Sequence, residues 1–184
     1  MEKRKGEWTV KKTSEKFTCD FFKVFEDEVL QPDGKPGSYA TITMKPGVNI
    51  LPVDDQENVY LTSQFRYAVD KNCLEVTAGG VEEGEEPLAS AKREASEELG
   101  IEAEEWTDLG LVDVDTSLVN APAYQFLARK LKFGESDQEG VENIKSIKMS
   151  LKEAVGKVMS GEITHAPSCL LIMKANLFLQ GNGE

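Results

Sequence analysis

Seven glutamates lie close together in the segment GGVEEGEEPLASAKREASEELGI, which spans residues 79–101. Acidic runs are often no more than the solvated face of a helix, so charge alone decides nothing. The spacing is more informative, because residues three and four apart are neighbours on a helix. Glu94 is therefore next to both Glu97 and Glu98, and like charges at this spacing destabilise a helix by roughly 0.2–0.5 kcal/mol per pair. A helix that is only solvated would more often alternate charges of opposite sign.

The same segment also has an apolar side. One stripe of the expected helix holds four apolar residues, namely Leu88, Ala91, Ala95 and Leu99. The three glutamates fall on a separate arc beside this stripe. Gly79 and Gly80, which precede the helix, allow a close approach of the backbone. Converging carboxylates of this kind predict a site of hard oxygen ligands for Mg²⁺ or Mn²⁺, whose charge would relieve the repulsion.

Length and composition set the class of protein. The 184 residues and the apolar content of 40% favour one domain with a sizeable core, and no repeat or internal boundary is evident. The 21 basic and 33 acidic residues give a formal charge of −12. This charge argues against non-specific binding to nucleic acid or to an anionic membrane. It does not exclude an anionic substrate, since a bound divalent cation inverts the local field of an acidic site.

Other residue types exclude several kinds of chemistry. The N-terminus, MEKRKGEW, lacks the apolar region of a signal peptide, and no apolar run approaches the ~20 residues that span a bilayer. We therefore expect a cytoplasmic protein. Cys19, Cys73 and Cys169 are widely separated and are expected to be small buried side chains in a reducing compartment. His165 is the only histidine, so a histidine-rich zinc site is excluded, and no serine lies in a nucleophile-elbow pattern.

The remaining sequence predicts the elements that must position the acids. Several segments have the composition or alternation of strands: residues 18–30, 38–44, 48–53, 59–65, 74–76, 106–114, 124–131 and 144–149. Asp33-Gly34 marks a hairpin turn between the first two, and residues 116–123 are expected to form a loop. Helices are predicted at 151–159 and at 166–179, where Pro167 lies near the first turn. Strands on both sides of a central helix, with two helices late in the chain, predict an α+β sandwich in which helices pack on a mixed sheet.

The fixed positions of the acidic segment resemble a known family motif. Gly79, Glu85 and the run Arg93-Glu94-Ala95-Ser96-Glu97-Glu98-Leu99-Gly100-Ile101 match the Nudix box, G-x5-E-x7-R-E-U-x-E-E-x-G-U, in which U is a bulky aliphatic residue. Every charged and glycine position agrees, and the departure is Ala95, which is small where the motif has a larger aliphatic. The stretches LTSQFRYAVDKNCLEVTAGGVEEGE and LKEAVGKVMSGEI also look like the ADP-ribose and nucleoside-diphosphate-sugar pyrophosphatase branch of that family.

This resemblance implies a fold and an activity. The fold would be an α/β/α sandwich with a mixed sheet and an N-terminal β extension, in a single Nudix domain over residues 1–184. Residues 1–47 would form the N-terminal β segment, and residues 48–184 the catalytic core. The activity would be Mg²⁺-dependent hydrolysis of the pyrophosphate bond of a nucleoside diphosphate sugar, with ADP-ribose giving AMP and ribose 5-phosphate. Alternatives are GDP-mannose, another nucleotide sugar or a dinucleoside polyphosphate as substrate, and a Nudix fold that only binds its ligand.

The motif also implies roles for particular residues. Glu94 and Glu98 would bind the metal directly, and Glu97 would be a bridging ligand or the base that activates water. A backbone carbonyl of Ala78 or Gly79 would add a further oxygen ligand. Such a site suits the chemistry, because a pyrophosphate is already activated but repels an incoming nucleophile until its charge is neutralised.

Further residues would support this centre or bind the substrate. Glu85 is expected to pair with Arg93 and to fix the loop on the helix, so Arg93 is given no catalytic role. Gly100 is expected to be structural. Arg66, in SQFRYAV, would contact the diphosphate, as the corresponding arginine in such enzymes often does, or would simply lie at a strand end.

Two more expectations follow from the same resemblance. Enzymes of this branch often take a further glutamate from a loop before a late strand, and in EGVENIKSI the candidate is Glu142, with Glu139 as the second. The alternative is that both are solvated loop acids. Related pyrophosphatases dimerise through an N-terminal segment like the one that contains Phe21, Phe22 and Phe25, so a homodimer is expected.

Overall fold

The computed structural model describes residues 3–136 and 144–181. The chain forms two compact units, the first from Met1–Lys45 with Asp113–Pro122 and the second from Pro46–Val112 with Ala123–Glu184. The predicted organisation, a single domain with a boundary between residues 47 and 48, stays a prediction. Each unit is described by itself.

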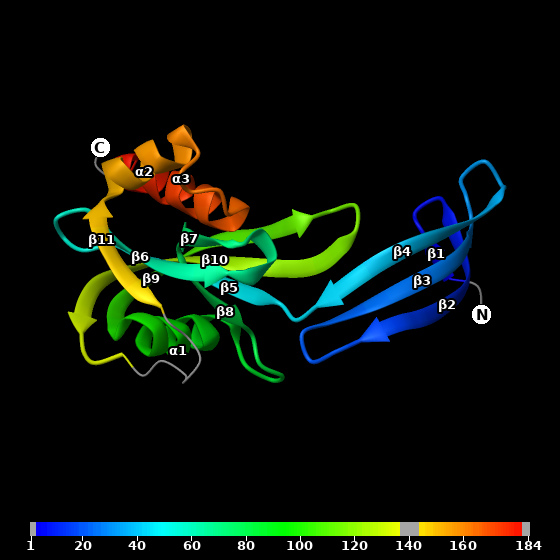
Figure 1. Cartoon of the computed structure of the whole chain (residues 1–184), viewed down its shortest axis with the longest axis horizontal. Helices are drawn as coiled ribbons and strands as arrows, with labels where there is room; N and C mark the ends of the chain where they lie inside the picture. The colour runs from blue at the N-terminus through cyan, green and yellow to red at the C-terminus, as the bar shows by residue number, and fades with distance from the viewer. Residues whose placement is uncertain (1–2, 137–143, 182–184) are drawn as a thin grey trace. The chain divides into compact units, whose positions relative to one another are not determined.

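The first unit is built on four antiparallel strands, to which the start of a later strand adds in parallel (Figure 1). Its strands are β1 (Lys3–Lys5), β2 (Trp8–Thr18), β3 (Phe22–Leu30) and β4 (Pro36–Met44), and the first residues of β10 (Val119–Phe133) pair with β4. The register of β3 and β4 runs from Phe22↔Met44 to Leu30↔Pro36, which confirms the predicted hairpin. Its turn is closed by a hydrogen bond of 2.8 Å from the Gly34 N–H to the Gln31 carbonyl, and Gly34 has a φ of +82°, which suits glycine.

Two sequence predictions about strand ends in this unit were wrong. Residue 18 ends β2, and residues 19–21 form the turn between β2 and β3 rather than the start of one long strand. β2 itself was not predicted. β2 is mostly exposed along its length, so its sequence, WTVKKTSEKFT, lacks the apolar alternation that marks a half-buried strand. The predicted loop at residues 116–123 is shorter than expected, because β9 (Ile101–Asp115) ends just before it and β10 begins at Val119. Only residues 116–118 form a turn, in which the Asp115 carboxylate accepts hydrogen bonds from the backbone N–H groups of Ser117 and Leu118.

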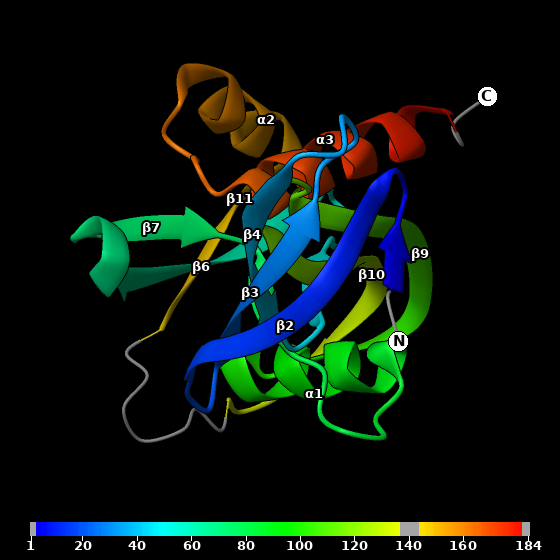
Figure 2. The same cartoon turned by 90° about the vertical axis from the view of Figure 1, so that its right-hand side faces the viewer.

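In the second unit, helices cover both faces of the sheets. Helix α1 (Pro87–Leu99) lies on one face, and α2 (Leu151–Ser160) and α3 (Ala166–Gly181) lie on the opposite one, as Figures 1 and 2 both show. The strands between them are β5 (Gly47–Pro52), β6 (Asn58–Arg66), β7 (Lys71–Glu75), β8 (Thr77–Gly80), β11 (Lys145–Ser150) and parts of β9 and β10. β5 is parallel to β10 and antiparallel to β8, and β11, β6 and β7 form an antiparallel sheet. The predicted fold class, α+β with a mixed sheet, is therefore confirmed.

The sequence of β5 explains how one strand supports both helix layers. Val48 and Ile50 pack in the core beneath α1, with Ala91, Ala95 and Phe126. Leu51, which directly follows Ile50 and points to the opposite face of the strand, belongs instead to the core that includes Leu127, Leu171 and Ile172. A strand that is buried on both faces reads as a nearly continuous apolar run, which is what the sequence GVNILP shows.

The helices α1 and α2 have sequence signals at their ends. Pro87 occupies the first position of α1, where its missing N–H costs nothing. Gly100 has a φ of +63° and donates its N–H to the Ala95 and Ser96 carbonyls, which ends α1. Ser150 caps α2, since its hydroxyl accepts a hydrogen bond of 3.1 Å from the Glu153 N–H. The predicted starts of α2 and α3 at residues 151 and 166 are confirmed.

Two predictions about burial were wrong. Ala91, Ala95 and Leu99 are buried as expected, but Leu88 is 37% exposed. Ser90 is buried in the first turn instead, because its hydroxyl donates to the Glu85 carboxylate of the preceding loop. The cysteines, all among the described residues, are free and only half-buried, since they lie in a turn, on the short strand β7 and in the first turn of α3. Within the described part of the chain, no helix is long and apolar enough to cross a membrane.

Candidate active site

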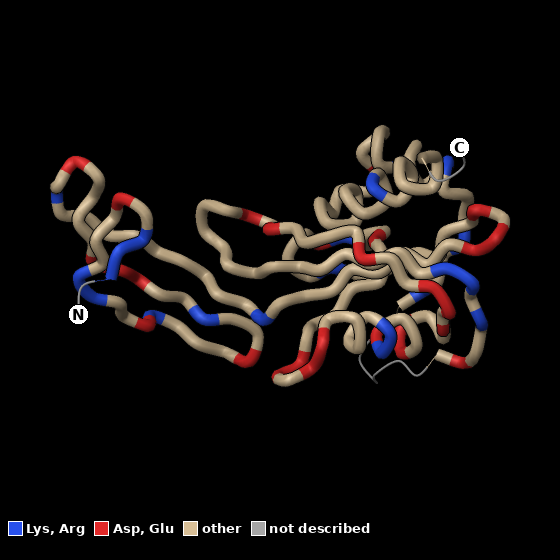
Figure 3. The backbone as a smooth tube through the Cα atoms, turned by 180° about the vertical axis from the view of Figure 1, so that it is seen from behind, with Lys and Arg blue, Asp and Glu red and all other residues tan. Residues whose placement is uncertain are grey.

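The box residues lie on a strand, a loop and a helix that follow one another in the second unit. β8 pairs with β5 in a register that places Gly79 opposite Val48. A short loop then turns at Gly84, whose φ is +80°, and leads into α1. Glu85 lies in this loop. Figure 3 shows acidic residues along the loop and on α1 itself. The end of β8 and the beginning of the box helix are thereby held next to one another.

Arg93 is the centre of the hydrogen bonds that join these segments. Its Nη2 donates to the Gly80 carbonyl over 3.1 Å and to Glu85 Oε2 over 3.2 Å. Its Nη1 donates to Glu94 Oε1 over 2.7 Å and to Glu97 Oε2 over 3.1 Å. One guanidinium thus ties the strand, the loop and the helix together and neutralises part of the charge of three glutamates.

The pKa values of the two partners reflect this arrangement. The hydrogen bonds from Arg93 and then from Ser90 lower the pKa of Glu85 to about 2, against an ordinary value of 4.5. The same pairing with Glu85, followed by the contacts with Glu94, raises the pKa of Arg93 above its usual range. Both groups remain charged across the neutral pH range. Glu85 and Arg93 therefore act as a fixed ion pair between loop and helix, and they do not exchange protons.

Glu94 and Glu98 are the two most buried acids of the helix. The Glu94 side chain is 14% exposed, and Glu98 as a whole residue is 8% exposed. Glu94 lies against the backbone of Gly79 so closely that a Cβ on Gly79 would fall within its carboxyl group. The Glu94 carboxylate and the backbone at Gly79 thus share one small region that only glycine leaves open. Carboxylate and carbonyl oxygens are the ligands that Mg²⁺ and Mn²⁺ prefer, so this donor set fits a divalent cation.

The acids are not yet arranged as a finished metal site. Among residues 3–136 and 144–181, no group of three or more His, Cys, Asp or Glu side chains has the geometry to hold a metal ion. Glu94 and Glu97 are instead ion-paired with Arg93. The Glu97 side chain is also the more exposed of these two. A cation at this place would compete with Arg93 for the Glu94 and Glu97 oxygens.

Arg66 brings a second positive charge into the same unit. It is the last residue of β6, and its Nη2 donates to Glu75 Oε2 over 2.6 Å while its Nε lies 3.2 Å from the same oxygen. The pKa of Arg66 is raised, first by the hydrogen bond to Glu75 and further by the charge of Glu98. The electrostatic field of the box helix therefore reaches the guanidinium of Arg66, which remains partly exposed.

Three residues that the sequence did not point to lie around the predicted site residues. Glu139 and Glu142 lie outside the described residues. Glu75, Ser90 and His165, which the sequence did not point to, all take part in hydrogen bonds or ion pairs with predicted residues or their neighbours. Ser90 occupies a variable position of the box. Glu75 and His165 are far apart in sequence, so no spacing pattern could have connected them.

The fold and the box together define a family. A model of the NUDIX domain matches residues 43–162, which is well over half of the chain. The protein therefore belongs to the Nudix family.

Several relatives of the chain are named as pyrophosphatases. The chain is 27% identical over 163 residues to the ADP-ribose pyrophosphatase of Bacillus subtilis (strain 168), and the match covers 88% of each protein. It is 34% identical over 106 residues to the ADP-sugar pyrophosphatase of Mus musculus, a match that covers 52% of this chain and 49% of that one. A solved structure described as an ADP compounds hydrolase superposes with a TM-score of 0.86, covers 98% of both chains and shares 19% of residues, which shows the fold.

Proposed function

We propose that this Nudix enzyme uses a divalent metal to hydrolyse the pyrophosphate bond of a nucleoside diphosphate sugar, with ADP-ribose giving AMP and ribose 5-phosphate. The pyrophosphatase names of its relatives support the reaction class. GDP-mannose, other nucleotide sugars and dinucleoside polyphosphates are the alternative substrates, and a Nudix fold that only binds its ligand is the alternative function.

One observation carries the proposal. The box helix offers buried carboxylates, and Arg66 offers a partly exposed guanidinium that the Glu98 charge still influences. A cation held by the box carboxylates would neutralise only part of the charge of a bound diphosphate. Arg66, whose guanidinium feels the charge of Glu98, could bind the remaining negative charge. The two kinds of group together match the two needs of the substrate, which are neutralisation and orientation.

The roles of the residues follow from the reaction. Water attacks one phosphorus, the bond to the bridging oxygen breaks, and the leaving phosphate keeps the electron pair. A bound divalent cation, which we propose is Mg²⁺ or Mn²⁺, supplies charge neutralisation and makes water more acidic. Glu94 and Glu98 would hold it, with the Ala78 or Gly79 carbonyl, and Arg66 would orient the diphosphate. Glu97 would bridge to the metal or accept the proton of water.

A substrate panel tests the proposed reaction. Purified protein is incubated with ADP-ribose, GDP-mannose, UDP-glucose and diadenosine polyphosphates, with Mg²⁺, with Mn²⁺ and with excess chelator, and products are separated by ion-exchange chromatography. AMP and ribose 5-phosphate from ADP-ribose, lost in chelator, are the expected result. Full turnover in chelator would overturn the metal dependence. Binding of the substrates without turnover would overturn the proposed hydrolysis and indicate a Nudix fold that only binds its ligand.

The loop acids are tested separately. We propose Glu142 as the catalytic base or an additional metal ligand, with Glu139 as the second candidate, because the box helix supplies acids from one side only. Glu142→Gln is expected to lower kcat far more than it raises KM, and Glu139→Gln is expected to be milder. A larger loss of kcat in Glu139→Gln than in Glu142→Gln would assign the role to Glu139. Native kcat in both variants would mean that the box glutamates carry out the chemistry alone.

The cellular setting and assembly are also proposed. We propose a cytoplasmic homodimer that binds a small nucleotide-sugar substrate and neither nucleic acid nor membranes. The formal charge of −12 supports the last point, because a strongly acidic surface repels both kinds of polyanion. Exposed phenylalanines in the first unit, Phe17 and Phe21, support dimerisation.

A further inference from the structure

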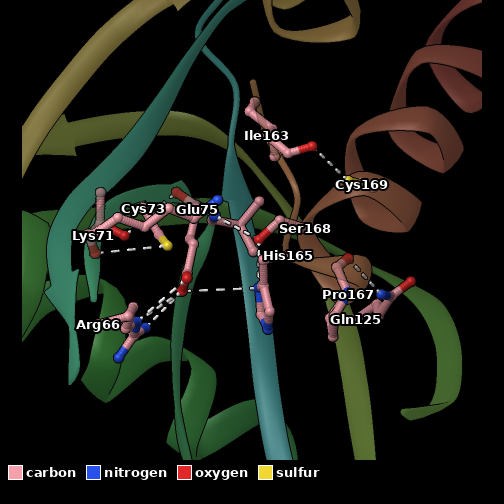
Figure 4. A network of polar contacts seen from close by, with 12 residues as sticks. Arg66, Lys71, Cys73, Glu75, Gln125, Ile163, His165, Pro167, Ser168 and Cys169 are labelled. Carbon is pink, nitrogen blue, oxygen red and sulfur yellow. Dashed lines mark hydrogen bonds and ion pairs between the residues drawn. The ribbon is translucent and has the colours of Figure 1, made fainter. Parts of the chain in front are cut away.

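The only histidine of the chain lies on the far side of the Arg66–Glu75 pair (Figure 4). His165 directly precedes α3, and its carbonyl accepts the first helical hydrogen bond, from the Cys169 N–H over 2.9 Å. Its Nδ1 is 2.8 Å from Ser168 Oγ, and this hydroxyl accepts a hydrogen bond of 3.0 Å from the Val76 N–H. The Ser168 hydrogen is therefore free to point at Nδ1, and in that arrangement the neutral imidazole accepts at Nδ1 and carries its proton on Nε2.

A single carboxylate oxygen lies between the two basic groups. Glu75 Oε2 is 2.6 Å from Arg66 Nη2 and 3.8 Å from His165 Nδ1. Glu75 is almost fully buried, so it has few other ways to satisfy its charge. In the neutral state of the imidazole, the close contact belongs to Arg66 alone. A proton on Nδ1 turns that nitrogen into a charged donor, and Glu75 Oε2 is the nearest anionic acceptor to it.

We propose that His165 is a positioning residue for substrate binding: a proton on its Nδ1 draws Glu75 Oε2 toward the imidazolium and releases the Arg66 guanidinium to bind the diphosphate. This inference rests on the proposed function, because it requires that Arg66 binds the diphosphate of the substrate. Arg66 has a firm partner in Glu75 as long as His165 is neutral, and that contact competes with the substrate. By linkage, a ligand that draws Arg66 away must also strengthen proton binding at His165.

The charges around the imidazole set the pH range of this effect. Burial lowers the pKa of His165 below its usual 6.5, the negative charge of Glu75 opposes this, and the positive charge of Arg66 adds to it. An anion bound to Arg66 offsets the positive charge of the guanidinium, so ligand binding raises the pKa of His165. The protonated form is therefore minor at neutral pH without ligand and gains population on the acid side of pH 6.5.

Other charged groups act on the pair from neighbouring elements. Glu98 of α1 and Cys73 of β7 both raise the pKa of Arg66 after Glu75 does. Lys71 of β7 donates to the Thr164 hydroxyl, next to His165, over 3.4 Å. Glu162, in the turn before His165, is ion-paired with Lys157 at 2.8 Å. Glu75 is the carboxylate that directly contacts both basic groups, and it is therefore the group over which they compete.

Because the chain has one histidine, its imidazole can be titrated without assignment. The Cε1–H signal is followed by NMR between pH 5 and 8, with and without α,β-methylene ADP-ribose and Mg²⁺, after calorimetry has confirmed saturation. The pKa is expected to rise with ligand in the wild type and to stay unchanged in Arg66→Gln. A rise of one unit corresponds to about tenfold tighter binding of the ligand to the protonated form. Superimposable titration curves with and without saturating ligand would overturn the proposal.

Kinetics test the same coupling through KM. His165→Asn keeps a side chain that suits the residue before a helix and can accept from Ser168, but it cannot take up a proton. The KM of the wild type for ADP-ribose is expected to fall about threefold to tenfold as the pH decreases through the imidazole titration, in line with the shift measured by NMR. The KM of the variant is expected to be flat, whereas the kcat profiles of the two proteins have the same shape.

Glu162 provides a matched control for the KM measurement, because it lies close to His165 but outside the Arg66–Glu75 pair. Glu162→Gln removes a carboxylate from the turn just before His165 and should keep the wild-type KM profile. Identical KM profiles in wild type and His165→Asn, with ADP-ribose hydrolysis intact, would overturn this inference and leave the proposed function standing. No turnover of any diphosphate, together with a ligand-induced pKa rise that depends on Arg66, would overturn the proposed function and support the inference.

Discussion

The Glu94 carboxylate lies directly against the backbone of β8 at Gly79. A Cβ on Gly79 would fall within that carboxyl group, whereas a Cβ on Gly80 would meet nothing within 4 Å. Gly79→Ala is therefore expected to displace Glu94 and to lower kcat by about 100-fold, while Gly80→Ala stays close to the wild type. Steady-state kinetics with ADP-ribose compare the two, and equal activity of both variants would contradict the assignment of Glu94.

Glu98 is expected to be needed for catalysis but not for the stability of the fold. Glu98→Gln keeps the volume of the side chain and removes one negative charge at a residue that is 8% exposed. We expect kcat to fall by about 100-fold or more, because a neutral amide is a poor ligand for a divalent cation. The thermal unfolding midpoint should hardly change or should rise, since Glu94 lies one turn away and the repulsion between the two carboxylates is lost.

The control for Glu98 is an acid from the same unit but outside the site. Glu105 forms a surface ion pair with Lys130 at 2.6 Å, so Glu105→Gln should keep native kcat and lose little stability. Undiminished turnover of Glu98→Gln would exclude Glu98 as a metal ligand.

Contacts between residues of the candidate site could be predicted from the sequence where both residues lie in one short segment. The box acids and the Glu85–Arg93 pair lie within one loop and one helix, so their spacing in sequence is also their spacing in space. Arg66 was noted for its flanking sequence, and its position at a strand end is observed. The Arg66–Glu75–His165 arrangement was not predictable, because β6, β7 and the start of α3 are brought together by folding alone.

At the scale of elements, the Glu85–Arg93 pair decides how the loop is held on α1. The pKa of Glu85 is lowered from 4.5 to about 2, so its contribution to stability is complete above pH 4.5 and is lost as the pH falls toward 2. Glu85→Gln should therefore have a lower unfolding midpoint than the wild type at pH 7, and this difference should vanish near pH 2. Thermal unfolding followed by circular dichroism over this pH range measures it.

The loop itself offers the control for this measurement. Glu83→Gln removes an acid two residues away from Glu85, and no ion pair is described for it. This variant should follow the wild type at every pH. A midpoint difference for Glu85→Gln that persists unchanged down to pH 2 would show that the loss comes from packing and not from the charge of Glu85.

Element ends were predictable to the extent that local chemistry sets them. Pro87 marks the start of α1 because the first helical position needs no N–H, and Gly100 and Ser150 mark helix ends through the hydrogen bonds of their own turns. The strands of the first unit were harder. β2 exposes most of its side chains, so its pairing with β3 comes from the backbone and from long-range contacts, which leave no alternation in the sequence.

At the scale of the molecule, the fold class followed from the order of elements. A strand-rich first half, one acidic helix and two late helices are compatible with few arrangements other than helices on both faces of a mixed sheet. Which strands are neighbours did not follow from this order. β5 lies beside β10, which is far along the chain, and this pairing depends on both strands being buried in the same core.

Dimerisation is expected to depend on exposed phenylalanines of the first unit. Phe17 and Phe21 are 53% and 77% exposed in the first unit, and Phe17 packs on Phe22 with ring centroids 5.5 Å apart. Burying a phenylalanine stabilises a protein by roughly 1.5–3 kcal/mol, so a cluster of this kind favours association with a second copy. Light scattering at micromolar concentration should give twice the chain mass of 20.3 kDa for the wild type and a monomer for the Phe17→Ser/Phe21→Ser double variant. Met159→Ser, which changes a residue exposed on α2, should remain a dimer. A monomeric wild type would refute the dimer, and a dimeric double variant would move the interface away from these phenylalanines.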